Sequence, residues 1–270
     1  MNKDDNAWRG ILADIGRTRT AQGRHRLGRF SIEGTRLHER ALRAGVEVEV
    51  VLAGESLATS SEERMRRLLA DLESSGCAVH VVPNDVMTKL TEGRDIGAIV
   101  GLVRLPSHHS LDQALLACGR HPSLILVAVD VEDPGNVGAM IRTALAASAA
   151  AFVAVGISDP YHPKAVRTSM GAVFRIPIVR HDTAHSLLAS LDGQGVGTVG
   201  AVSRGGTAPD GLRLEVPSIA VLIGSEAFGL SKEVCADLDH LVSIPMSSEV
   251  DSFSANAAAA ILLYALRGRA

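Results

Sequence analysis

The second half of the chain alternates short apolar segments with helix-like segments, and this alternation limits the folds that it can adopt. The first apolar segment, Leu124–Val129, has no polar residue, which is typical of a strand buried on both faces. We expect strands at 124–130, 151–155, 176–179, 198–202, 219–223 and 241–244, and helices at 163–170, 184–191, 231–238 and 256–267. Strands joined by crossover helices predict a doubly wound parallel sheet in an α/β fold.

The first half predicts a second, smaller α/β domain. Its expected strands are 29–33, 46–53, 78–82 and 98–105, and its expected helices are 35–44, 60–75 and 84–90. A connector rich in Pro, Ser and His separates the halves, although residues 111–118 could form a helix within it. With 270 residues the chain can hold two modest domains, which we place at 1–105 and 115–270.

Composition excludes several classes of protein. The three cysteines, Cys77, Cys118 and Cys235, are far apart and form no CxxC pair, which argues against a disulfide framework or a zinc site. We therefore expect no metal and a reducing, cytoplasmic location. The N-terminus lacks the apolar core of a signal peptide, and the longest apolar run, 257–266, is too short to cross a bilayer. A soluble protein without a membrane partner is expected.

The segment 16–29 is strongly basic although the net charge of the whole chain is −3. It contains no acidic residue, and its arginines are Arg17, Arg19, Arg24, Arg26 and Arg29. Such a run could form an exposed helix face, or it could bind the phosphates of a nucleic acid. On its own the run favours RNA binding only slightly.

Arg142 is the one charged residue between Asp133 and Asp159. It follows a Pro-Gly-Asn turn that opens an Ala-rich helix, in which Asn136 is a plausible N-cap and Pro134 lies just outside. An arginine in apolar surroundings needs a partner, because burying an unpaired guanidinium is costly. A structural ion pair with Asp130, Glu132 or Asp133 is one interpretation. The position just past the carboxyl end of a strand favours the other, an arginine that faces an anionic substrate or a developing oxyanion.

Two further segments have the composition of ligand-binding loops. Residues 221–231 end a strand in a Gly-Ser-Glu-x-x-Gly loop, whose small residues allow close approach of a ligand. Residues 242–256 leave a strand through Pro245 and enter an Ala-rich helix. Either loop alone could be an ordinary connection. No Gly-x-Gly-x-x-Gly fingerprint, P-loop or Gly-x-Ser-x-Gly elbow occurs.

Taken together, three segments resemble the signature motifs of the SpoU-type RNA ribose 2′-O-methyltransferases of the SPOUT class. They are 133–144 (DPGNVGAMIRTA), 223–230 (IGSEAFGL) and 244–246 (IPM) with the following Ser252. The resemblance implies a parallel sheet with a C-terminal trefoil knot, S-adenosylmethionine bound in that knot, and a homodimer. The helix at 256–267 is a candidate dimer surface, although a buried core helix has the same pattern. The first half would be a ribosomal-protein-like domain that captures RNA.

The resemblance also assigns roles to individual residues. The catalytic residues would be Asn136, Arg142 and Glu226, and the cofactor-binding residues Gly224, Glu226, Gly229, Ile244, Met246, Ser252 and Phe253. An arginine is a poor base because its pKa lies above about 12. Arg142 would therefore orient the ribose hydroxyl and stabilise the developing oxyanion, with an RNA phosphate as proton acceptor. A base role for Arg142 stays open, and Asn136 could hold the arginine or the ribose or cap its helix.

The third motif differs from the family pattern at Ser248, Phe253, Ser254 and Asn256, where relatives usually have Gly, Leu, Asn and Ser. The leading hypothesis is 2′-O-methylation of ribosomal RNA, as a housekeeping or an antibiotic-resistance modification. One alternative is an RNA-binding or ribosome-assembly factor that has lost catalysis through these changes. The others are a transfer-RNA ribose methyltransferase and an unrelated doubly wound binding protein.

Overall fold

The computed structural model describes residues 7–94, 97–107, 110–118, 123–212, 214 and 216–267. Contacts divide the chain into two compact units. The first comprises Met1–Pro106 and Tyr161–Phe174, and the second comprises Ser107–Pro160 and Arg175–Ala270. Each unit has its own sheet and is described separately.

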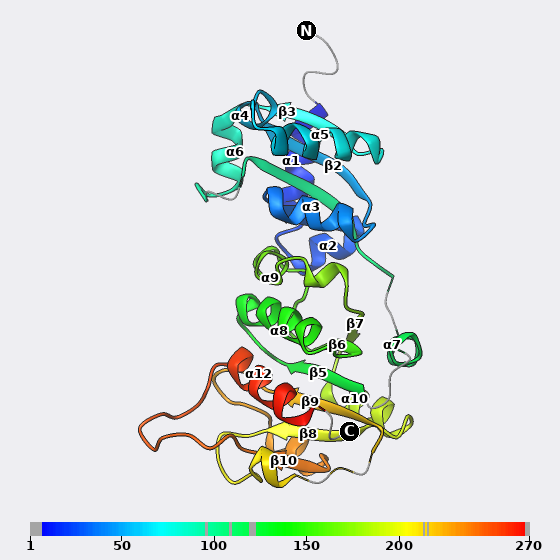
Figure 1. Ribbon diagram of the computed structural model, residues 1–270, viewed down its shortest axis with the longest axis vertical. Helices are drawn as coiled ribbons and strands as arrows, with labels where there is room; N and C mark the ends of the chain where they lie inside the picture. Colours follow the sequence, from blue (N-terminus) through cyan, green and yellow to red (C-terminus); the bar gives the residue numbers. More distant parts are fainter. Residues whose placement is uncertain are drawn as a thin grey trace. The chain divides into compact units, whose positions relative to one another are not determined.

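The first unit is built on a four-stranded mixed sheet (Figure 1). Its strands are β1 (Arg29–Glu33), β2 (Val48–Gly54), β3 (Ala78–Val82) and β4 (Ile99–Arg104). Their order is β1-β4-β2-β3, with β4 antiparallel to both of its neighbours and β2 parallel to β3. All four strands coincide with expected ones, but the pairing directions depend on contacts between segments distant in sequence.

Most helices of the first unit come from the N-terminal part of the chain. They are α1 (Ala7–Arg17), α2 (Ala21–Leu27), α3 (Thr35–Arg43), α4 (Glu55–Ala58), α5 (Glu63–Ser74) and α6 (Asn84–Leu90). The basic segment thus forms the end of α1, the turn after it, α2 with its cap Gly28, and the first residue of β1. Trp8 of α1, the single tryptophan, packs against the core cluster that contains Leu52, Met87 and Leu102.

A segment from the second half of the sequence belongs to this first unit. It contains α9 (Pro163–Thr168) and a 3₁₀ turn, η2 (Ala172–Phe174). The ring of Phe30 in β1 lies 5.1 Å from that of Tyr161 and 6.5 Å from that of Phe174. Arg167 donates to the Glu33 carboxylate at 3.0 Å. We expected this segment to belong to the second domain, with a helix at 163–170. Aromatic packing and this ion pair instead hold it in the first unit.

The second unit contains a six-stranded sheet in which all pairs are parallel, as the strand pattern predicted. The strands are β5 (Ser123–Val129), β6 (Ala151–Val155), β7 (Ile178–His181), β8 (Gly197–Ala201), β9 (Ser218–Ile223) and β10 (His240–Val242). Their order is β10-β8-β9-β5-β6-β7. Every residue of β5, β6 and β9 is buried, which explains their continuous apolar sequences.

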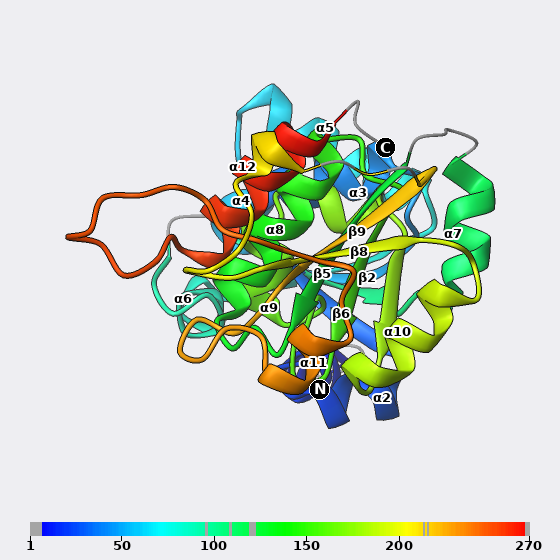
Figure 2. The ribbon, with the colours of Figure 1, turned by 90° about the horizontal axis from the view of Figure 1, so that it is seen from below.

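Helices cover both faces of this sheet (Figure 2). On one face lie α7 (Leu111–Cys118), α10 (Ala184–Asp192) and α11 (Lys232–Ala236), packed on alternate residues of β5 such as Ile125 and Val127. On the other face α8 (Pro134–Ala146) lies beside α12 (Ala255–Leu266), and both contact β5. A short turn, η3 (Pro209–Gly211), completes the described elements. No helix of the described ranges is long and apolar enough to cross a membrane.

Helix α8 begins differently from our expectation. Asp133 is its N-cap and accepts a hydrogen bond from the Gly135 amide at 2.9 Å, while Pro134 is the first helical residue. The predictions that Asn136 caps the helix and that Pro134 lies outside it are therefore wrong. Proline suits the first helical position because the missing N–H needs no partner there. With the cap supplied by Asp133, the Asn136 side chain is available for another contact.

Candidate functional site

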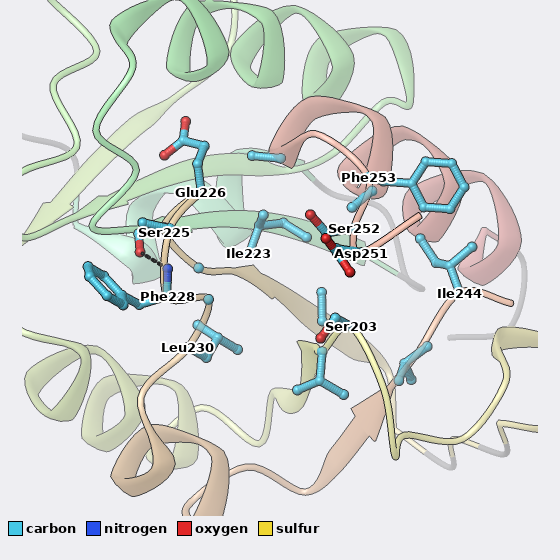
Figure 3. Close-up of a pocket in the computed structure, with 18 of the residues that line it drawn as sticks. Ser203, Ile223, Ser225, Glu226, Phe228, Leu230, Ile244, Asp251, Ser252 and Phe253 are labelled. Carbon is cyan, nitrogen blue, oxygen red and sulfur yellow. Dashed lines mark hydrogen bonds between the residues drawn. The ribbon is translucent and has the colours of Figure 1, made fainter. Parts of the chain in front are cut away.

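A pocket of about 430 Å³ opens at the carboxyl ends of β8, β9 and β10 (Figure 3). Loops that follow all three strands line it, together with the first turns of α12. In a parallel sheet this edge collects loops from several strands, and ligands commonly bind there. All seven residues expected to bind the cofactor line this pocket: Gly224, Glu226, Gly229, Ile244, Met246, Ser252 and Phe253.

The loop after β9 forms one wall of the pocket and folds back on itself. The Gly229 amide donates to the Ser225 carbonyl at 2.9 Å, and the Phe228 amide donates to Oγ of Ser225 at 3.2 Å. A Cβ atom on Gly224 would lie 2.1 Å from the Gly229 carbonyl carbon, and Gly229 has a φ of +68°. Both glycines are therefore required by the fold of the loop itself, whatever it binds.

The loop between β10 and α12 forms the opposite wall (Figure 3). Ser252 and Asp251 lie in this wall, and Phe253 keeps 38% of its surface exposed. Sequence reasoning missed Asp251 and also Ser203, which follows β8. Asp251 could have been found from its place beside Ser252, whereas Ser203 opens a glycine-rich loop to which the motifs assigned no role.

Two of the three expected catalytic residues are in direct contact. Nδ2 of Asn136 donates to Oε1 of Glu226 at 2.8 Å. The other carboxylate oxygen, Oε2, accepts from the Glu132 amide at 3.1 Å. Because Glu226 also lines the pocket, these bonds attach the start of α8 to the pocket wall. Of the roles considered for Asn136, the helix cap is excluded because Asp133 is the cap, and in the described ranges the Asn136 side chain contacts Glu226 and not Arg142.

Arg142 lies apart from this pair. Its side chain is exposed, and it makes no hydrogen bond or ion pair with any residue that the structure describes. The alternative of a structural ion pair with Asp130, Glu132 or Asp133 is therefore wrong for the chain by itself. Arg142 follows Asn136 by six residues, roughly 9 Å along the helix axis. A guanidinium without a partner on the chain is free to contact a bound anion.

The basic segment divides into two kinds of arginine. Arg24 is 3% exposed, and its guanidinium donates to the Thr18 carbonyl at 2.6 Å, so it stabilises the fold and is not available to RNA. This corrects our expectation for Arg24. Arg26 is exposed and has no partner in the described ranges. The remaining three are in ion pairs: Arg17 with Asp14 at 2.7 Å, Arg19 with Glu92 at 3.3 Å, and Arg29 with Glu49 at 2.5 Å.

Comparison with known proteins agrees with this geometry. Residues 123–264 match the SpoU rRNA methylase family, and residues 14–100 match the MRM3-like substrate binding domain. The chain also has a parallel sheet with a pocket at its carboxyl edge. This geometry and the matches together place the chain among the SPOUT-class methyltransferases. Within that class the chain belongs to the SpoU rRNA methylase family. In the described ranges no three His, Cys, Asp or Glu side chains come together in a group that could hold a metal.

Individual relatives cover most or all of the chain. The 23S rRNA (guanosine(2553)-2′-O)-methyltransferase RlmP of Bacillus subtilis is 30% identical over 270 residues, which are 99% of this chain and 100% of the relative. An uncharacterized tRNA/rRNA methyltransferase of Mycobacterium bovis is 33% identical over 232 residues, 83% of this chain and 70% of that protein.

Solved structures show the same fold. The SpoU methyltransferase AviRb from Streptomyces viridochromogenes, in complex with the cofactor AdoMet, has a TM-score of 0.83 at 27% identity, covering 100% of this chain and 98% of its own. An AdoMet-bound rRNA methyltransferase from Sinorhizobium meliloti has a TM-score of 0.79 at 26% identity, covering 95% of this chain and 94% of its own.

Proposed function

We propose that this protein transfers a methyl group from S-adenosylmethionine to the 2′-hydroxyl of a ribose in ribosomal RNA. The observation that carries the proposal is the pocket at the ends of β8, β9 and β10, which collects all seven expected cofactor residues beside the Asn136–Glu226 pair. Membership of the SpoU rRNA methylase family and the activity named for the Bacillus relative support ribosomal RNA as the substrate.

The lining of the pocket fits S-adenosylmethionine. Its volume of about 430 Å³ lies within the roughly 300–1,000 Å³ of small-molecule sites. Leu230, Ile244 and Phe253 offer apolar surface to an adenine ring, and Asp251 and Ser252 offer oxygen atoms to ribose hydroxyls. The two neighbours with AdoMet bound have the same fold, which supports this occupant.

Glu226 of the pocket wall and the side chains of Asn136 and Arg142 on α8 suit transfer to a hydroxyl. Bound S-adenosylmethionine supplies an electrophilic sulfonium methyl. Arg142, which has no partner in the described part of the chain, is proposed to orient the attacking hydroxyl and to stabilise the negative charge that develops on its oxygen. A guanidinium holds its proton too strongly to act as a good base, so we propose an RNA phosphate as proton acceptor. Asn136 and Glu226 keep α8 against the pocket wall.

We propose that the first half, residues 1–105, captures the RNA and that residues 115–270 hold the cofactor. The match of residues 14–100 to a substrate binding domain supports the first role. In the basic segment Arg26 is the arginine without a described partner, and Arg17, Arg19 and Arg29 are exposed or partly exposed. Phosphates can compete for arginines in surface ion pairs, because such pairs are weak in water.

A trefoil knot and a homodimer complete the proposal. After β10 the chain runs past the pocket and returns as α12 beside β9 and α8, a path compatible with a knot. On α12, Ile261 and Tyr264 are 36% and 64% exposed, and Arg267 stacks over Tyr264 at 3.6 Å. We propose this exposed face as the dimer contact, and the cytoplasm as the compartment in which the protein meets ribosomal RNA.

Calorimetric titration of the purified protein with S-adenosylmethionine tests the cofactor, and transfer of a labelled methyl group to unmodified 23S rRNA tests the reaction. We expect one site per chain and a product with a 2′-O-methylribose. Methylation of transfer RNA in place of 23S rRNA would reassign the substrate. Absence of cofactor binding, even with RNA present, would contradict the proposal and favour an RNA-binding or assembly factor.

A further inference from the structure

Asn256 lies in the first turn of α12 and contacts the helix that carries Arg142. We propose that Asn256 is a positioning residue: through its hydrogen bond with Thr143 it fixes α8, and with it Arg142, against the wall of the cofactor pocket. This inference rests on the proposed function, since it concerns the placement of Arg142 for methyl transfer.

The contact itself is a single hydrogen bond between the two helices. Oγ1 of Thr143 donates to Oδ1 of Asn256 at 2.8 Å across 113 residues of sequence. Both residues are half-buried. The two helices are in contact, and Met140 and Ala144 of α8 and Ala259 of α12 are buried. A hydrogen bond is directional, so this contact adds a specific alignment of the two helices to their apolar packing.

Asn256 also belongs to the turn of α12 that forms the pocket wall. Its neighbours on α12, Ala255 and Ala258, line the pocket, and Oγ of Ser254 caps the helix by accepting from the Ala257 amide at 3.4 Å. A ligand that fixes this turn therefore acts on the element that holds Thr143. Relatives usually have Asn and Ser at the positions of Ser254 and Asn256, and here each of these two residues has a defined contact.

Helix α8 is thus held at two points on one face. Asn136 and Thr143 are seven residues apart, close to two helical turns, so their side chains leave the same side of the helix. Asn136 contacts Glu226 of one pocket wall, and Thr143 contacts Asn256, which lies in the turn of α12 next to the other wall. Arg142 lies between these two points and has no described partner, so its position depends on the backbone of α8. Displacement of a reacting group by about 1 Å can cost roughly 100-fold in rate.

Four variants distinguish the effect of losing this hydrogen bond from the effect of changing the volume of the side chains. Thr143→Val and Asn256→Leu keep nearly the same shape but remove the donor and the acceptor. Thr143→Ser and Asn256→Asp retain the hydroxyl donor and an acceptor oxygen, and should rescue. Thr88→Val is a matched control: its hydroxyl donates to the Asn84 carbonyl at 2.9 Å within α6 of the first unit, so the same loss of a hydroxyl does not touch α8.

The first readout needs no RNA. Hydrogen–deuterium exchange of the α8 amides at 140–146 is measured with and without saturating S-adenosylmethionine. In the wild type, Thr143→Ser, Asn256→Asp and Thr88→Val, we expect the cofactor to slow exchange at least about threefold. In Thr143→Val and Asn256→Leu we expect less than half of that protection, although the cofactor still binds with a dissociation constant within about threefold of the wild-type value. Equal protection in all variants would overturn the inference.

The second readout is methyl transfer to 23S rRNA transcribed in vitro. We expect Thr143→Val and Asn256→Leu each to lower kcat about tenfold with KM for S-adenosylmethionine nearly unchanged, and the double variant to be no worse than either single one. If these variants only lower the melting temperature or weaken cofactor binding, and kcat is unchanged, the bond is merely structural and the inference is overturned. Failure of the wild type to bind the cofactor would instead contradict the proposed function.

Discussion

Asn136 and Glu226 are 90 residues apart in sequence, and their side chains form a hydrogen bond of 2.8 Å. The same carboxylate accepts the Glu132 amide at 3.1 Å, so Glu226 joins the start of α8 to the loop after β9. Loops that follow neighbouring parallel strands meet at one edge of the sheet, and here β5 and β9 are direct neighbours. This arrangement connects the pocket, which we propose as the cofactor site, with the helix that carries Arg142.

Replacing Arg142 by alanine should strongly slow methyl transfer without affecting the fold. The side chain is exposed and has no described partner, so we expect an unchanged melting temperature and a cofactor dissociation constant within about threefold of the wild-type value. Loss of an oxyanion donor should lower kcat by about 100- to 1,000-fold. Single-turnover assays on 23S rRNA measure this effect, and a kcat within tenfold of the wild-type value would exclude the assigned role.

Asn136 and Glu226 should act as one unit. We expect Asn136→Ala and Glu226→Ala each to lower kcat about 10- to 100-fold, because each removes the partner that holds the other. The double variant should lose little more than the worse single variant, which a double-mutant cycle on kcat tests. If the fold-losses in kcat of the two single variants multiply in the double variant, the two residues act independently.

Gly224→Ala should distort the pocket. The added Cβ would lie 2.1 Å from the Gly229 carbonyl carbon, so the loop must move. We expect a loss of about 1–3 kcal/mol in the free energy of unfolding, as for overpacked sites, together with loss of measurable cofactor binding. Gly193→Ala is the control, since its nearest neighbouring atom would lie at 3.6 Å. Thermal melts and calorimetry compare the two, and equal behaviour would refute the steric argument.

Two arginines of the basic segment should respond differently to substitution. Arg26→Gln should weaken RNA binding and lower the slope of log affinity against log salt by about 1, with stability unchanged. Arg24→Gln should instead destabilise the first unit by roughly 1–3 kcal/mol, because the Thr18 carbonyl loses a buried donor. Filter binding at several salt concentrations and urea unfolding distinguish these results. A destabilised Arg26→Gln variant would contradict the distinction between Arg24, which stabilises the fold, and Arg26, which is available to RNA.

His38 should make the stability of the first unit depend on pH. It is fully buried, Nδ1 lies 2.8 Å from the Gly34 carbonyl oxygen, and burial lowers its pKa from 6.5 to about 4. The unfolded chain therefore binds a proton below pH 6.5 that the folded chain does not bind until about pH 4. His38 contributes its full stability above pH 6.5, and this contribution falls by up to about 3 kcal/mol as the pH falls to 4.

Urea unfolding followed by Trp8 fluorescence measures this dependence, since Trp8 packs against the core of the first unit. His38→Leu removes the titrating group, while the Gly34 carbonyl still accepts from the Leu37 amide at 3.2 Å. The variant should therefore show a smaller fall in stability between pH 6.5 and 4 than the wild type. Identical dependence of stability on pH in the variant and the wild type would contradict the assignment of this effect to His38.

The sequence was sufficient for features that depend on local patterns. Expected and observed strands agree within a few residues at all six positions of the second sheet, because strands buried on both faces read as continuous apolar runs. The helix cap was not predicted correctly. Asp133 and Asn136 are both good capping residues, and local sequence does not decide which side chain a distant carboxylate, Glu226, will engage.

By itself the sequence determined the α/β class, the strands, and the motifs whose family resemblance pointed to the residues around the pocket. Tertiary structure decided which of these residues meet. It joined Asn136 to Glu226 and Thr143 to Asn256, buried Arg24, and packed the segment of Tyr161 against Phe30 in the first unit. The physical reason is that apolar periodicity reports only whether a face is buried, whereas hydrogen-bond partners and packing neighbours depend on strand order and on contacts between distant segments.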